Sequence, residues 1–145
     1  MNAGVSSINT LPATSSKGWT IALWIAQLAV AGILGMMAFV KFFNYTPEGS
    51  MALATALGVG RGVVTMIGLV ETAAVIAILT PRLHAVGALL GVATALGALF
   101  SHATKIGFSG SPVAEMWVMA LVVLAASAFV LVSRRKELPV VGSSL

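Results

Sequence analysis

The sequence has no cysteine and very little charge. Of its 145 residues only 8 are Lys or Arg and 4 are Asp or Glu, so charged residues make up 8% of the chain, against roughly 25% in a typical soluble domain. Without cysteine the chain cannot form a disulfide, a thiolate metal site, an iron–sulfur cluster or a covalent haem attachment, and dithiol–quinone chemistry is excluded as well. The net charge of +4 is scattered along the chain, so we expect no nucleic-acid partner.

Hydrophobic residues are abundant instead. They make up 59% of the sequence, and the mean hydropathy is +1.04, which is typical of a polytopic membrane protein. Four apolar stretches are long enough to cross about 30 Å of hydrocarbon at a rise of 1.5 Å per helical residue. We therefore predict an all-α fold, an integral membrane four-helix transmembrane bundle in contact with the lipid bilayer. Its spans are expected at about 19–40, 62–79, 83–104 and 113–132.

We place the membrane domain at residues 18–136, with polar segments on both sides of it. Residues 1–17 are expected to form an N-terminal tail, and residues 137–145 a C-terminal tail.

The segment between the first two spans, residues 42–60, is not expected to cross the membrane. Its apolar run, 51–57, is too short. Residues 46–48 (Thr-Pro-Glu) are typical of a helix start, and Gly58 and Gly60 of a helix end. We therefore predict a short interfacial helix between spans 1 and 2.

Four spans place both termini on the same side of the membrane. Five of the eight basic residues fall on that side and three on the other, so the positive-inside rule predicts cytoplasmic termini. We also expect the protein to lie in the inner (cell) membrane of a bacterium. The cluster at 134–136 is typical of a stop-transfer signal and also attracts lipid headgroups. The two sets are Lys17, Arg82, Arg134, Arg135 and Lys136 on one side and Lys41, Arg61 and Lys105 on the other.

Glu71 is the most informative polar residue because it falls at the centre of the second span, with Gln27 and Thr94 at similar depth. An ionised carboxylate there costs about 2.5–3.5 kcal/mol on insertion scales. Glu71 must therefore face the bundle interior, be protonated or pair with a cation. Two interpretations remain open: a structural hydrogen bond or ion pair that fixes the bundle, and a proton carrier or ligand to a bound headgroup.

Four ionisable side chains from the helix ends fall in a second layer, about 12–16 Å toward the outer side. They are Lys41, Arg61, His102 and Glu115. One hypothesis is that they line a pocket for the headgroup of a quinone or a lipid. The alternative is that they point to water, or that one cation turns inward to pair with Glu71 or Glu115.

The third span carries a stripe of small residues that includes Gly87 and Gly91 and continues to His102, which is therefore expected to face protein. We expect this stripe to pack within the chain rather than in a dimer. His84 and His102 are separated by about 27 Å along one helix, so they cannot bind one haem iron as a bis-His pair. We expect no metal site and no intrinsic cofactor.

A series of short motifs along residues 20–130 carries a family resemblance. In chain order these are Gly35 and Lys41, Leu57-Gly58, Ile67-Gly68 with Glu71 and Ala73-Ala74, Ile78 to Arg82 (Ile-Leu-Thr-Pro-Arg), and Gly87-Ala88 followed by Ser101-His102. In this combination the chain resembles the DoxX/DoxD-like family of small four-span membrane proteins. The resemblance matches the family's Glu to Glu71, its His to His102 and its basic residue to Lys41. It implies association with membrane redox systems such as thiosulfate:quinone oxidoreductase, or with the assembly of other membrane proteins.

Three functions are therefore considered. The first is a small accessory subunit of a quinone-linked membrane redox complex, and the second a non-enzymatic assembly or structural subunit of a larger membrane complex. A small transporter ranks third, because four spans are few and no inverted repeat is visible. The sequence contains no nucleophile–base pair, phosphate loop or metal motif, so we do not expect the chain to be catalytic alone.

Overall fold

The computed structural model describes residues 17–109 and 113–138, and every regular element in these ranges is a helix. Four of the helices are long and apolar enough to cross a membrane. Most of the two predicted tails, residues 1–16 and 139–145, lies outside the described residues. The elements are α1 (Lys17–Phe43), α2 (Ser50–Leu57), α3 (Arg61–Leu79), α4 (His84–Ser101), the π-helical turn η1 (His102–Ile106), α5 (Val113–Ser133) and the 3₁₀ turn η2 (Arg135–Glu137).

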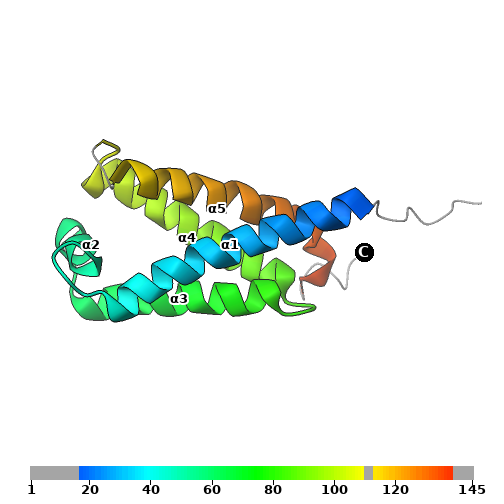
Figure 1. Ribbon diagram of the computed structural model, residues 1–145, viewed down its shortest axis with the longest axis horizontal. Coiled ribbons are helices and arrows are strands. Elements are labelled where there is room, and N and C mark those ends of the chain that lie inside the picture. Colours follow the sequence, from blue (N-terminus) through cyan, green and yellow to red (C-terminus); the bar gives the residue numbers. More distant parts are fainter. Residues whose placement is uncertain (1–16, 110–112, 139–145) are drawn as a thin grey trace, which may run out of the picture.

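The four long helices form a bundle in which α1 and α4 each pack against both α3 and α5. Helix α1 runs obliquely across the bundle, and α2 lies at the end where α1 finishes and α3 begins (Figure 1). The start of α1 and the end of α5 lie together at the opposite end (Figure 1). The predicted all-α four-helix bundle, with a short helix between the first two spans, is confirmed.

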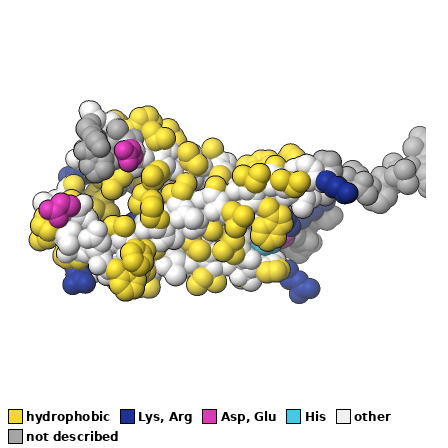
Figure 2. Space-filling model, viewed as in Figure 1, with side chains coloured by type: hydrophobic (Ala, Val, Ile, Leu, Met, Phe, Trp, Pro, Cys, Tyr) yellow, Lys and Arg dark blue, Asp and Glu magenta, His cyan; other side chains and the backbone are white. Residues whose placement is uncertain are grey.

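The outward faces of the long helices carry large apolar side chains. On the face shown in Figure 2, charged side chains gather near the two ends and apolar ones cover the length between them. In a bilayer such side chains contact acyl chains, so the protein is an integral membrane protein whose surface meets lipid. Examples of exposed apolar residues are Ile25, Phe39, Met66, Ile76, Phe100 and Val132.

Two glycines of α4 allow the long helices to approach closely. A Cβ atom on Gly87 would collide with the backbone of Ile78 in α3, and one on Gly91 would collide with the Ser127 hydroxyl of α5. Both glycines are buried. The predicted small-residue stripe therefore packs within the chain, as expected, and joins α4 to both neighbours.

The short helix α2 begins later than the Thr-Pro-Glu motif predicted. The Thr46 hydroxyl donates to Oδ1 of Asn44 rather than capping a helix. The Asn44 carbonyl instead accepts from both the amide and the hydroxyl of Ser50, so the chain turns first and the helix starts at Ser50. The expected end is correct: Gly58 adopts a left-handed conformation with φ of 68°, and its amide caps the last turn of α2.

Candidate functional site

A buried ion pair joins the first two spans. The Lys41 Nζ atom in α1 donates to both carboxylate oxygens of Glu71 in α3, at 2.8 and 2.9 Å. It also donates to the Met37 carbonyl at 3.4 Å, so all three ammonium hydrogens have an acceptor. The two residues are only 7% and 3% exposed. Glu71 thus faces the interior, as predicted, and of the two candidate cations Lys41 is its partner.

This pair confirms the alternative in which one cation of the outer layer turns inward to pair with Glu71. Side chains on a helix lean toward its N-terminus. Since α1 and α3 are antiparallel, the Lys41 side chain leans toward the middle of the bundle and the Glu71 side chain leans toward Lys41. Depth measured along the helix axis locates the backbone of each residue, and the two charged groups meet because their side chains lean toward one another.

Gly68 explains the spacing of the Gly-x-x-Glu motif. It lies one turn from Glu71 on the same face of α3, and a Cβ atom there would lie 3.3 Å from Cβ of Lys41 and 3.1 Å from the Phe42 ring. The missing side chain lets α1 come close enough for the Lys41 ammonium to reach the carboxylate. In this motif Gly68 allows α1 and α3 to approach closely, and Glu71 forms the ion pair between them.

His102 closes the π-helical turn at the far end of α4. It is 4% exposed, and its Nδ1 lies 2.9 Å from the Gly107 carbonyl. Because a carbonyl only accepts hydrogen bonds, Nδ1 carries the hydrogen and Nε2 is the second polar atom of the ring. As predicted, His102 faces protein rather than lipid.

Two aromatic residues beside His102 were not anticipated from the sequence. The Phe108 ring stacks on the imidazole with centroids 6.2 Å apart, and Trp117 packs edge-on against Phe108 at 5.8 Å. The Trp117 indole also donates to the Phe108 carbonyl at 3.1 Å. A tryptophan in the first turns of the fourth span, just after a Gly- and Ser-rich loop, was the available signal.

The other two members of the predicted outer layer are exposed. The Arg61 guanidinium lies 4.8 Å above the Tyr45 ring, and Glu115 lies in the first turn of α5. Within the described ranges no hydrogen bond or ion pair joins Arg61, His102 and Glu115 to one another. A pocket shared by these residues stays a prediction.

A second polar contact lies near the C-terminal end of α3. The Ile78 carbonyl accepts from the Gln27 amide at 3.3 Å and from His84 Nδ1 at 2.8 Å. Carbonyls in a last helical turn lack a backbone partner, and Pro81 in the following turn has no amide hydrogen to offer. Gln27 and His84 therefore tie α1 and α4 to this helix end, a role for His84 that the sequence did not reveal.

The other polar groups of the bundle differ in how they are bonded. The Thr94 hydroxyl donates to Leu90 of its own helix at 2.8 Å. Gln27 Oε1 and the Ser127 hydroxyl are fully buried, and neither has a hydrogen-bond partner within the described structure. Across the same residues, no three His, Asp or Glu side chains lie close enough together to hold a metal ion.

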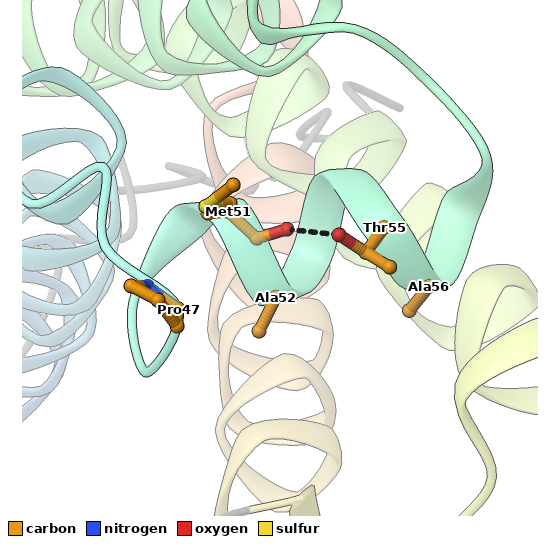
Figure 3. A pocket seen from close by; sticks show the side chains of 5 residues that line it. All are labelled: Pro47, Met51, Ala52, Thr55 and Ala56. Carbon is orange, nitrogen blue, oxygen red and sulfur yellow. Dashed lines mark hydrogen bonds between the residues drawn. The ribbon is translucent and has the colours of Figure 1, made fainter.

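A shallow pocket of about 430 Å³ lies on the outer face of α2, away from these groups (Figure 3). It is lined by Pro47, Met51, Ala52, Thr55 and Ala56. The Thr55 hydroxyl already donates to the Met51 carbonyl at 2.9 Å (Figure 3). The lining is therefore apolar in effect and includes none of the candidate site residues.

Comparison with protein-family models, with curated proteins and with solved structures gives no match. The four apolar helices support a small four-span membrane protein. A relationship to a particular family depends on the motifs quoted above. Three of their residues, Gly68, Glu71 and Lys41, lie together where α1 contacts α3.

Proposed function

We propose that this protein is a small accessory subunit of a larger membrane complex, with a quinone-linked redox complex as its host. The observation that carries the accessory role is the Lys41–Glu71 pair, in which the two buried charges satisfy each other. A catalytic acid or base needs a lone pair or proton that can reach a substrate. Here the membrane-buried charges hold α1 against α3, and the outward faces are left to contact lipid and partner helices.

The redox context is supported by the resemblance to the DoxX/DoxD-like family, and it includes a quinone as the candidate ligand. Following the same resemblance and the distribution of basic residues, we place the protein in a bacterial inner membrane with both termini in the cytoplasm.

A second candidate role, direct contact with a quinone or lipid headgroup, is favoured by the environment of His102. The Gly107 carbonyl and the Phe108 ring fix the orientation of the imidazole. Nε2 therefore lies on the side of the ring that faces away from the Gly107 carbonyl. With the hydrogen on Nδ1, Nε2 carries a lone pair and can accept a hydrogen bond from a headgroup hydroxyl. This role is compatible with an accessory subunit and does not require catalysis by the chain itself.

Native mass spectrometry of the gently solubilised protein tests the proposal, because it detects partner chains and bound quinone together. We expect a larger partner to co-purify with the wild type and with Glu115→Gln, whose carboxylate is exposed. We expect less partner with Glu71→Gln, which leaves the Lys41 charge buried and unpaired. A wild-type chain without any partner, together with unchanged quinone reduction in membranes that lack it, would refute the proposal.

A further inference from the structure

A groove opens between α1 and α5 at the end of the bundle that holds the start of α1. Its volume is about 380 Å³, near the lower end of the roughly 300–1,000 Å³ of ligand pockets. It therefore suits a headgroup rather than a whole lipid. It is lined by Trp19, Phe129, Val132, Ser133, Arg135 and Lys136.

One wall of the groove is aromatic and lies where a membrane interface is expected. The Trp19 and Phe129 rings meet edge to face, with centroids 5.1 Å apart. Trp19 is in the first turn of α1, and Phe129 is in the last turns of α5, which ends at Ser133. Aromatic side chains at the ends of spans sit at headgroup level, so this wall can cover the upper part of an acyl chain.

The other wall carries unneutralised positive charge. Arg134 is held by Glu137 at 3.0 Å, which neutralises the one carboxylate of this turn. Arg135 and Lys136 are exposed, and in the described part of the chain no acidic side chain pairs with either of them. The Ser133 hydroxyl donates to the Phe129 carbonyl, so the two cations are the groups that would attract a ligand. They follow directly after the end of the span, where lipid phosphates are expected.

We propose that this groove binds the headgroup of an anionic phospholipid. Arg135 and Lys136 contact its phosphate, and the rings of Trp19 and Phe129 with the Val132 side chain cover the beginning of an acyl chain. Basic pockets between spanning helices are known to favour anionic headgroups. A zwitterionic lipid has the same acyl chains but no net charge, so the site distinguishes the two by charge. The proposal depends neither on the function proposed above nor on which side the termini face.

Trp19 is a built-in reporter for this site. The chain has three tryptophans, so Trp24→Phe and Trp117→Phe leave only the indole in the groove. The full-length protein is reconstituted into vesicles that contain increasing fractions of brominated phosphatidylglycerol or brominated phosphatidylcholine, and quenching of Trp19 fluorescence is measured. We expect half-quenching at a fraction of phosphatidylglycerol about fivefold to thirtyfold lower than of phosphatidylcholine, as expected for two surface basic residues.

Arg135→Gln with Lys136→Gln should abolish this preference. Arg82→Gln is the matched control, because Arg82 is an exposed basic residue in the turn between α3 and α4, at the same end but not in the groove. It should keep the preference.

Salt provides a second measurement on the same single-tryptophan protein, and it needs no substitution of the basic residues. Raising the salt concentration from about 0.05 to 0.5 M shortens the Debye length from roughly 14 to 4 Å and should remove most of the preference. Equal quenching by the two lipids at low salt would overturn the proposal, as would a preference that survives the double substitution.

Discussion

Lys41 and Glu71, thirty positions apart in the sequence, are joined by two hydrogen bonds of 2.8 and 2.9 Å inside the spanning bundle. The ion pair has two consequences. Each residue alone is a membrane-buried charge, but together they present none to the lipid. Removing one partner is therefore expected to cost far more than removing both.

The first prediction compares a single and a double variant of this pair. Glu71→Gln strands the buried ammonium and should lower the free energy of unfolding by about 3–5 kcal/mol. Adding Lys41→Met removes the stranded charge and should restore most of that loss. Reversible unfolding in mixed micelles provides the measurement.

Glu115→Gln is the control for this comparison, because it removes an exposed carboxylate. It should change the free energy of unfolding by no more than about 0.5 kcal/mol. If Glu71→Gln is as stable as the wild type, the pair does not hold the bundle together.

The second prediction concerns the contact between α3 and α4. In Gly87→Ala the new methyl group would lie 2.7 Å from the Ala77 carbonyl carbon and even nearer to the Ile78 backbone. Backbone atoms cannot rotate away, so we expect a loss of about 1–3 kcal/mol. Gly97→Ala in the same helix meets no atom within 4 Å and should be neutral or stabilising by up to about 1 kcal/mol.

Thermal unfolding of the two alanine variants in detergent distinguishes these effects. Equal stability of the two variants would argue that α3 and α4 pack less closely than the structure shows.

The membrane architecture was predictable because hydropathy and helix length can be read directly from consecutive residues of the sequence. The four spans, the helix after the first span and the small-residue stripe around Gly87 and Gly91 all follow from periodicity and composition. These properties depend on local sequence and on the thickness of a bilayer, and neither requires knowledge of which helices are neighbours.

The partners of the polar residues were not predictable in the same way. Whether Glu71 pairs with Lys41 or Arg61 depends on the direction in which the side chains point and on the oblique path of α1. Neither can be obtained from the position of a residue along its own helix. Likewise, Gln27 and His84 meet at one carbonyl because three helices converge there. The contacts of His102 with Phe108 and of Phe108 with Trp117 depend on how the loop folds back on the bundle.

The third prediction tests the unbonded hydroxyl in the core. Ser127 is fully buried, its Oγ has no hydrogen-bond partner in the described structure, and it faces Gly91 closely. Burying an unpaired hydroxyl costs about 1–3 kcal/mol in proteins. Ser127→Ala should therefore be neutral or raise the free energy of unfolding by about 1 kcal/mol.

Ser133→Ala is the comparison for this variant, because its hydroxyl donates to the Phe129 carbonyl at 2.7 Å. It should show no such gain. A clear loss of stability in Ser127→Ala would reveal a partner for the hydroxyl, such as a buried water.

The last prediction separates the structural role of His102 from a role in ligand binding. The side-chain amide of asparagine can take the place of Nδ1–H, so His102→Asn can keep the bond to the Gly107 carbonyl but removes Nε2. His102→Ala removes both nitrogen atoms and the stacking on Phe108. We expect His102→Ala to lose about 1–2 kcal/mol of stability and His102→Asn to lose less than half of that.

Quinone content and partner association then identify the role of Nε2. If His102 serves only the bundle, His102→Asn keeps both, because the turn that it closes is intact. If Nε2 contacts a headgroup, His102→Asn assembles normally with its partners but loses bound quinone, and His102→Gln, whose amide reaches the position of Nε2, regains part of it. A stable His102→Asn protein with full quinone content would therefore rule out the headgroup role and leave the accessory role intact.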